Sequence, residues 1–181
     1  LNAFNKVNWN DIEYIMICVK PADSSKILNE IKSFCCKNHL VISFVAGLRT
    51  TTISKLILSK SSVIRIMPNI FISSNNSASA VYSKDLKANL KKKITRDFKN
   101  FGKIVWVDHE KKIDFFTAMF GGGPAYFFYI LGCLKKLIKK NGFSDTVSSS
   151  LLTSLIEGLL FEIKSKTTSF DESIKKVASK G

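Results

Sequence analysis

Three apolar segments of this 181-residue chain are each followed by a pair of residues that ends a strand and suits a ligand-facing loop. The pairs are Lys20-Pro21, Ala46-Gly47 and Pro68-Asn69. In a parallel sheet the loops after the strands lie along one edge, and α/β domains bind their ligands at that edge. The spacing therefore predicts that three loops converge on one ligand. The alternative at any single loop is that proline or glycine only terminates the strand.

The segments that position these loops are predicted as alternating strands and helices. Continuous apolar runs are typical of strands buried on both faces of a parallel sheet, and apolar residues at helical spacing indicate the helices between them. Asp23 or Ser24 is expected to cap the first helix, and Thr50, Thr51 or Thr52 the second. Strands are expected at residues 14–19, 40–45, 63–67, 78–82 and 104–107, and helices at 23–37, 50–57 and 84–101.

The pattern beyond residue 110 is helical. Pro124, which follows the run Gly121-Gly122-Gly123, suits the first turn of a helix. The spacing of apolar residues changes to a purely helical one near residue 110, without any flexible linker, and this change places a domain boundary there. The predicted fold is α/β then all-α, with a partial Rossmann-like parallel sheet domain in residues 1–110 and a helical domain in residues 111–181. Helices of the second domain are expected at 111–120, 124–140 and 146–164. A further short helix is expected in the tail 165–181, where Phe170, Ile174 and Val177 have helical spacing.

The formal charge of +14 is typical of nucleic-acid-binding proteins, because clustered Lys and Arg neutralise phosphates. Arginine makes the bidentate contacts to phosphates and bases, yet only Arg49, Arg65 and Arg96 are arginine among 28 basic residues. The densest lysine clusters, in residues 91–93 and 135–140, fall in helical patterns where solvated faces are expected. We therefore expect no nucleic-acid partner, and a basic nucleic-acid-binding module is the weaker alternative.

The cysteines show no metal-binding pattern. They form no C-x-x-C pair, and the two histidines lack ligand spacing, so no metal is expected. Adjacent Cys35 and Cys36 are awkward for a disulfide and suit a reducing, cytoplasmic location. All four cysteines, which include Cys18 and Cys133, are expected to be buried as small hydrophobic residues. The acidic residues expected to be solvated or salt-bridged rather than catalytic are Asp108, Glu110, Asp114 and Glu157.

The longest uncharged stretch, residues 115–134, lies between lysine-rich flanks. The Gly121–Pro124 run divides it, so the apolar helix after Pro124 is short for a membrane span. We expect a buried helix or a subunit interface here, and no membrane. The helices after Pro124 carry more hydrophobic surface than a small helical unit hides by itself, which predicts a partner subunit.

Four segments together are specific enough to indicate a family. They are Cys18-Val19-Lys20-Pro21, residues 41–47, residues 63–69 and residues 117–126, in that order and at those intervals. With them the chain resembles pyrroline-5-carboxylate reductase, the enzyme that makes proline. The resemblance implies reduction of 1-pyrroline-5-carboxylate to L-proline with NADPH or NADH. It also implies a homodimer or larger homo-oligomer, because the family's helical domain interleaves with that of a second subunit to complete the active site.

The resemblance also implies which residues face the cofactor and the substrate. Hydride transfer to a cyclic imine needs no metal and no protein nucleophile, since the cofactor supplies the hydride. No catalytic residue is expected in the chain, because the family's threonine would follow Gly181. The implied cofactor-binding residues are Asn5, Val19, Lys20, Pro21, Phe44, Val45, Ala46, Met67, Pro68 and Asn69. The implied substrate-binding residues are Gly122, Val177, Ser179 and Gly181.

The chain departs from the family pattern at two places. Gly122 stands where the family has serine, and the lost hydroxyl is expected to weaken substrate or interface packing. Phe44 and Val45 stand where the family has small residues, and the bulk of Phe44 is expected to narrow the cofactor cleft.

By the resemblance, the family pattern extends beyond both ends of the chain. The family's first strands and its G-x-G-x-x-G segment would precede Leu1, together with the loop that distinguishes NADPH from NADH. The end of the substrate loop would follow Gly181. We therefore expect the isolated chain to show no cofactor-dependent turnover in an activity assay. The alternative is a decayed, non-enzymatic remnant that keeps only the fold and self-association.

Overall fold

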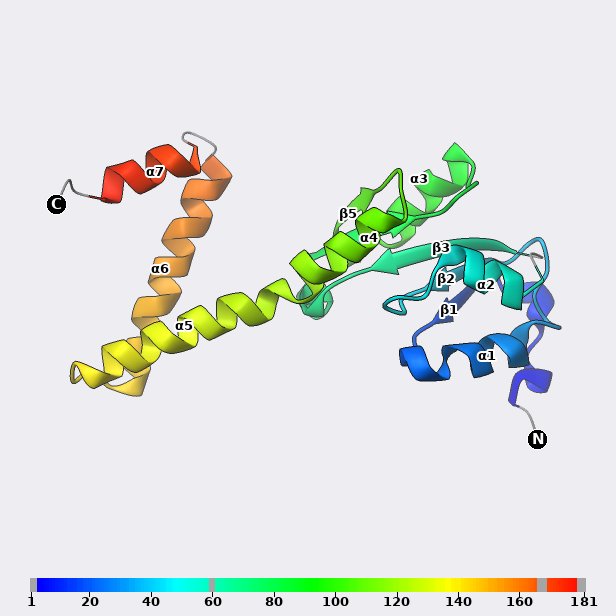
Figure 1. The fold of residues 1–181 in the computed structure, drawn as a ribbon, viewed down its shortest axis with the longest axis horizontal. Coiled ribbons are helices and arrows are strands. Elements are labelled where there is room, and N and C mark those ends of the chain that lie inside the picture. The colour runs from blue at the N-terminus through cyan, green and yellow to red at the C-terminus, as the bar shows by residue number, and fades with distance from the viewer. Residues whose placement is uncertain (1–2, 59–60, 166–168, 179–181) are drawn as a thin grey trace. The chain divides into compact units, whose positions relative to one another are not determined.

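The computed structural model describes residues 3–58, 61–165 and 169–178 of the chain. It divides into two compact units, Leu1–Pro124 and Ala125–Gly181, and each is described by itself. The first unit is an α/β sheet with its helices, and the second is helical (Figure 1). The predicted fold class, α/β followed by all-α, is confirmed.

A five-stranded sheet in the order β1-β2-β3-β4-β5 forms the first unit. β1, β2 and β3 are parallel, and the register places Ile17 beside Ser43 and Ser43 beside Arg65. The predicted βαβαβ arrangement is present, since one helix follows β1 and another follows β2 (Figure 1). The bounds are β1 Tyr14–Ile17, α1 Ser24–Ile31, β2 Leu40–Ser43, α2 Thr50–Leu56 and β3 Ser62–Met67.

The fourth strand reverses direction. β4 (Ser77–Tyr82) runs antiparallel to β3, whereas β5 (Gly102–Trp106) is parallel to β4. Residues 68–76 join β3 to β4 through a short 3₁₀ turn, η4 (Ile70–Ser74), and a parallel crossover needs a longer connection. The helix α3 (Ala88–Asp97) supplies that connection between β4 and β5. The prediction of a parallel sheet is therefore wrong for the β3–β4 pair.

The core lies on both faces of this sheet because neighbouring residues of a strand point to opposite sides. Val41 and Val63 pack with residues of α1 and α2, and Ile42 and Ile64 pack with residues of α3. All four residues of β2 are buried. In β1 buried and more exposed side chains alternate instead, because this strand forms the edge of the sheet. Met16, for example, is 55% exposed. The prediction that the first strand is buried on both faces is wrong for that reason.

None of the four cysteines forms a disulfide, and Cys35 is buried whereas the other three are exposed. Cys18 follows the last residue of β1, Cys36 lies in the turn after α1, and Cys133 lies on an exposed side of α5. Burial as small hydrophobic residues is therefore wrong for three of the four, because these three positions lie outside the packed faces of strands and helices.

The helical part agrees closely with the pattern of the sequence. α4 continues into a π-helical turn, η6 (Thr117–Gly121), before α5 begins at Gly123. Ser169 and Glu172 form a capping box at the start of α7, which satisfies main-chain donors there. The bounds are α4 Lys111–Phe116, α5 Gly123–Lys140, α6 Asp145–Ser165 and α7 Phe170–Val177.

Two helical stretches of the described residues are long and apolar enough to cross a membrane by length and composition alone. They are Lys111–Lys140, with a mean hydropathy of 1.2, and Asp145–Ser165, with a mean hydropathy of 1.3. Only 11% of each apolar window is buried within the chain. A large apolar surface in the helical part therefore needs a covering that the chain by itself does not give.

Gly102 is a position where the backbone requires glycine. Its φ is +109°, and an added Cβ would lie 2.4 Å from the Ser77 carbonyl oxygen and 2.9 Å from that of Asn75. We predict that Gly102→Ala lowers the free energy of unfolding by about 3 kcal/mol. Gly47→Ala is the control, because Gly47 also has a positive φ but nothing lies within 4 Å of its added Cβ. We expect Gly47→Ala to lower the free energy of unfolding, measured by urea denaturation, by about 1 kcal/mol. Equal losses in the two variants would contradict the clash at Gly102.

Candidate cofactor-binding edge

The carboxyl ends of β1, β2 and β3 meet along one edge of the sheet. Parallel pairing in register puts the ends of the first two strands, Ile17 and Ser43, side by side, and Arg65 lies next to Ser43. The residues that follow the three strands are therefore neighbours, as the sequence predicts (Figure 1). Val19, Lys20 and Pro21 leave β1 and enter a 3₁₀ turn, and Lys20 and Pro21 are exposed.

The larger side chains of the loop after β2 are turned into the core. Val45 is only 3% exposed and belongs to the core on the α1 side. Phe44 turns to the other face, where its ring lies 6.3 Å from that of Phe98 and 6.0 Å from that of Phe101. The ring of Phe44 is thus accommodated among aromatic residues. Ala46, which is exposed, is the side chain of this loop that faces solvent.

The turn after β3 is fixed by hydrogen bonds. The main-chain nitrogen of Asn69 donates to Ser77 Oγ at 2.9 Å, which ties the turn to the start of β4. Its side-chain oxygen accepts from the nitrogen of Phe71 and so caps η4. Because that oxygen is occupied, Asn69 shapes the turn, and half-buried Met67 and Pro68 form its surface.

The glycine run meets this turn. An added Cβ on Gly121 would lie 3.6 Å from Met67 Cε and 3.7 Å from Thr117 Cγ2. The main-chain nitrogen of Gly122 donates to the Thr117 oxygen at 3.1 Å, the bond of a π turn. π turns are uncommon and frequent at functional sites. Two of the four segments that carry the family resemblance, far apart in the sequence, therefore lie close together.

Asn5, which was also expected to bind the cofactor, does not lie at this edge. Asn5 is exposed in η1 (Ala3–Lys6), in a segment tied through Trp9 to His39. The Trp9 main-chain oxygen lies 2.9 Å from His39 Nε2, and His39 precedes β2, so this segment lies by the amino end of that strand. Val177 is exposed in α7 of the second unit. Ser179 and Gly181 lie outside the described residues.

A buried ion pair next to the edge is the feature that the sequence interpretation missed. Arg65 is 2% exposed, and its Nη1 donates to Glu110 Oε1 at 2.9 Å. Glu110 also accepts from the Thr50 nitrogen at 2.7 Å and from Thr50 Oγ1 at 2.9 Å. Arg49 pairs with Asp114 at 3.1 Å. The signal in the sequence was an arginine inside the otherwise apolar run of β3, where an unpaired charge is costly.

The acidic residues are largely salt-bridged, as predicted. Glu110 and Asp114 pair with arginine, and Asp108 pairs with Lys112 at 2.7 Å. The Lys112 ammonium lowers the pKa of the Asp108 carboxyl. Glu157 is exposed on α6. No group of three His, Cys, Asp or Glu residues in the described ranges is placed to hold a metal ion.

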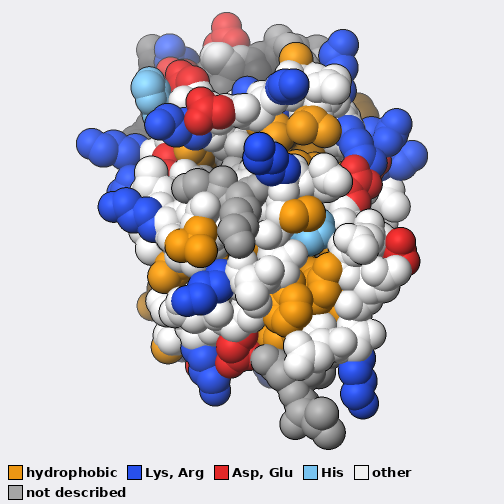
Figure 2. Space-filling view, turned by 90° about the vertical axis from the view of Figure 1, so that its right-hand side faces the viewer, with side chains coloured by type: hydrophobic (Ala, Val, Ile, Leu, Met, Phe, Trp, Pro, Cys, Tyr) orange, Lys and Arg blue, Asp and Glu red, His pale blue; other side chains and the backbone are white. Residues whose placement is uncertain are grey.

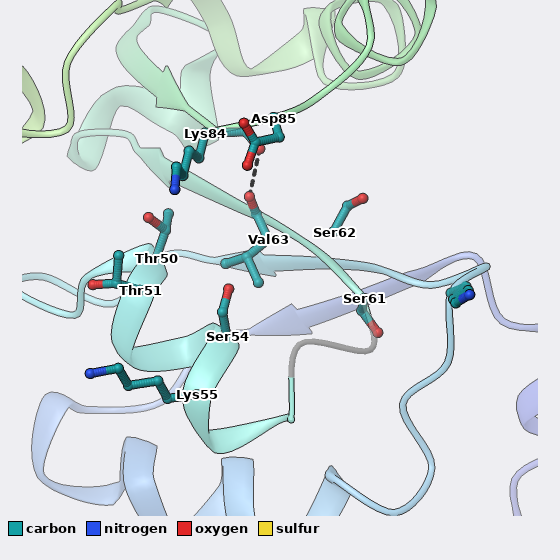
Figure 3. A pocket seen from close by; sticks show the side chains of 11 residues that line it. Thr50, Thr51, Ser54, Lys55, Ser61, Ser62, Val63, Lys84 and Asp85 are labelled. Carbon is teal, nitrogen blue, oxygen red and sulfur yellow. Dashed lines mark hydrogen bonds between the residues drawn. The ribbon is translucent and has the colours of Figure 1, made fainter.

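A separate hollow of about 540 Å³ lies beside α2 (Figure 3). Thr50 and Ser54 line it from the helix, Val63 from the amino end of β3, and Lys84 and Asp85 from the loop after β4. None of the residues expected to bind cofactor or substrate belongs to it. The hollow is therefore distinct from the predicted edge.

The basic charge is dispersed on the visible surface. Figure 2 shows lysine and arginine side chains spread over one face of the molecule, with hydrophobic side chains between them. On α3, Lys93 bonds Asp97 and Glu13, so part of the lysine cluster is neutralised. Nucleic-acid-binding surfaces usually gather the charge in a patch or stripe, which this face lacks.

The sheet, its helices and the shared edge define a Rossmann-like α/β unit, a class of fold whose ligands lie at the carboxyl ends of the strands. A family model described as pyrroline-5-carboxylate reductase dimerisation matches residues 110–181. Pyrroline-5-carboxylate reductase 1 of Bacillus subtilis (strain 168) is 29% identical over 148 residues, which are 81% of this chain and 50% of that protein. Pyrroline-5-carboxylate reductase of Aquifex aeolicus (strain VF5) is 24% identical over 170 residues, or 93% of this chain and 63% of that protein.

Solved structures agree. The crystal structure of Plasmodium falciparum pyrroline carboxylate reductase with NADP bound has a TM-score of 0.85 and 27% identity, and the match covers 92% of this chain and 63% of that one. The chain is therefore pyrroline-5-carboxylate reductase-like in sequence and in fold, which confirms the resemblance. It spans between 50% and 63% of the length of these three relatives.

The reactivity of the Cys18 thiol can be used to measure the environment of the candidate cofactor-binding edge. It directly precedes Val19, and partial burial raises the pKa of its thiol above the ordinary value of 9.0. Because the thiolate is the reactive form, we predict that alkylation of Cys18 by iodoacetamide follows a titration with a midpoint above pH 9.0. Peptide mass spectrometry across a pH series measures this. The urea-unfolded chain is the control, and a folded midpoint at or below the unfolded one would contradict the prediction.

Proposed function

We propose that this chain supplies the cofactor wall and the dimerisation helices of an NADPH- or NADH-dependent pyrroline-5-carboxylate reductase. The reaction would be reduction of 1-pyrroline-5-carboxylate to L-proline, as in proline biosynthesis. The observation that carries the proposal is the convergence of three strand ends at one edge, with the Met67 side chain against the glycine run. The proposed cofactor contacts are the three turns at residues 19–21, 44–46 and 67–69.

The residues at the edge fit an anionic dinucleotide. Lys20 is the one charged residue in the sequence of the three turns, and its sign suits a phosphate. The exposed Ala46 leaves room for close approach, whereas the main-chain nitrogens of Phe44 and Val45 already donate to Ile17 and Ser43. A site made of main chain and small or apolar side chains suits a reaction in which a reduced nicotinamide supplies the hydride.

The chain's own contribution to the reaction would be orientation and exclusion of water. Met67 and Pro68 present an apolar surface beside Gly121, which favours a dry contact with a flat ring. The bond from Asn69 to Ser77 keeps this surface in place. A fixed apolar wall lowers the entropic cost of bringing the reacting atoms together. Gly122 and Val177 remain the proposed substrate contacts.

The helical unit is proposed to bind a second copy of this chain. The family model that matches residues 110–181 is described by dimerisation, and α5 and α6 expose long apolar faces that such a partner would cover. The cysteine thiols of the described residues suit the reducing, cytoplasmic location that we propose.

Ala46→Tyr tests the cofactor edge. The substitution places a bulky ring in the proposed cleft without touching the core, because Ala46 is exposed. We predict that it weakens NADPH binding at least about tenfold, measured by titration calorimetry or by nicotinamide fluorescence. Ala88→Tyr is the matched control, because Ala88 is an exposed alanine at the start of α3. The helix α3 follows β4, which runs antiparallel to β3, so α3 begins at the opposite edge of the sheet.

Equal affinities for the two tyrosine variants would contradict the location of the site. Failure of the unaltered chain to bind NADPH or NADH at millimolar concentrations would contradict the cofactor proposal. The non-enzymatic remnant, which keeps the fold and self-association, would then be the better account.

Leu155→Glu tests the partner. Leu155 is half exposed on α6, so a charge there would be buried only in an assembly. We predict that the unaltered chain is a dimer or larger in sedimentation equilibrium, and that Leu155→Glu shifts it toward monomer. Thr153→Glu is the control, because Thr153 lies on the other side of α6. A monomeric chain that floats with phospholipid vesicles would contradict the proposal and favour a membrane.

A further inference from the structure

Arg65 lies on the face of the sheet that carries α2. Residues of a strand alternate between faces, and Val63 belongs to the core packed by α1 and α2, so Arg65 points the same way. Its side chain is buried, and its second nitrogen, Nη2, has no hydrogen bond among the described residues. Nη2 lies 3.7 Å from Asp114 Oδ1. Glu110 is therefore the group that both bonds and neutralises this arginine.

Glu110 also caps a helix from a distant part of the chain. α2 has Arg49 at its N-cap position, which gives no side-chain cap, so the predicted threonine cap is replaced. Instead both the nitrogen and the hydroxyl of Thr50 donate to Glu110, which is 60 residues later in the sequence. A carboxylate at this end satisfies an otherwise unpaired main-chain donor and suits the helix dipole.

The pair connects the two loops that flank the proposed cofactor. Thr50 begins the helix that follows residues 44–47, and Arg65 is two residues before Met67. Glu110 precedes α4, which leads into the glycine run. The first residue of α2 and a residue inside β3, each close to one of the two loops, thus share a single carboxylate.

We propose that Arg65 and Glu110 are positioning residues that hold the loop at residues 44–49 and the turn at residues 67–69 at a fixed separation for the cofactor. The consequence for the cofactor rests on the proposed function, whereas the coupling of the two loops does not. Neither residue reaches a reacting atom, because the guanidinium is buried and both carboxylate oxygens are occupied by chain donors.

The effect of the pair on stability can be separated from its effect on the position of the loops, because each buried charge is compensated by the other. Removing one partner leaves a buried charge uncompensated, whereas replacing both by apolar residues of similar size removes that cost. The double variant Arg65→Met/Glu110→Leu should therefore recover most of the stability lost in Glu110→Gln or Arg65→Met. It cannot recover the cap on Thr50 or the link between the loops.

The experiment compares hydrogen exchange with stability in the full chain. Amide exchange is measured by mass spectrometry for peptides covering residues 44–50 and 67–70, and for β1 as an internal reference. Urea denaturation gives the stability of each variant. In both single variants we expect lower stability and exchange at the two loops at least about tenfold faster. In the double variant stability returns toward that of the unaltered chain, while the loops still exchange about tenfold faster.

Lys112→Met is the matched control. Lys112 lies close to Glu110 in the sequence and pairs with Asp108, but both side chains of that pair are more than half exposed, so its loss should change neither stability nor loop exchange. Loop exchange that returns to the unaltered rate in the double variant would overturn the proposal, because the pair would then be a core stabiliser only. Loops that respond independently of each other in the single variants would overturn it as well.

A titration with NADPH separates this inference from the proposed function. If the unaltered chain binds NADPH, the double variant should bind it at least about tenfold more weakly despite its recovered stability. If the unaltered chain does not bind it, the proposed function fails, and the exchange experiment still decides whether the pair couples the loops.

Discussion

Parallel pairing of β1, β2 and β3 is the constraint on which the structure depends. Side-chain burial fixes the register, because a shift by one residue would move Val41 to the face of α3 and Ile42 to the face of α1. Once the register is fixed, the turns after the three strands must share an edge. The buried pair of Arg65 and Glu110 then ties the helix after the second strand to the third strand.

Local signals in the sequence predicted most of this architecture. The proline and glycine after the first three strands mark their ends, and helical spacing indicates each of α1 to α7, although α1 ends at Ile31 rather than at residue 37. The order of the motifs also indicated the family resemblance, and the structure brings two of them, the turn at Met67 and the glycine run, close together. Such features depend on short stretches of chain, where periodicity and turn chemistry act directly.

Features that depend on distant partners were not predictable in the same way. The reversal of β4 depends on a connection too short for a crossover, and the exposure of Met16 depends on the position of β1 at the edge of the sheet. The cap of α2 comes from Glu110, although the threonines at the start of that helix are residues that commonly cap a helix locally. Pairings over tens of residues leave no periodic mark, so an arginine inside an apolar strand was the one available signal.

The account depends most directly on whether the three turns contact one dinucleotide. Titration of the ¹⁵N-labelled chain with NADP⁺, followed by amide chemical shifts, measures this residue by residue. The account predicts shifts that saturate together at residues 18–21, 44–47 and 67–69, with no change at Ser54 and Lys84 in the hollow beside α2. Shifts confined to one turn, or centred on that hollow, would contradict it.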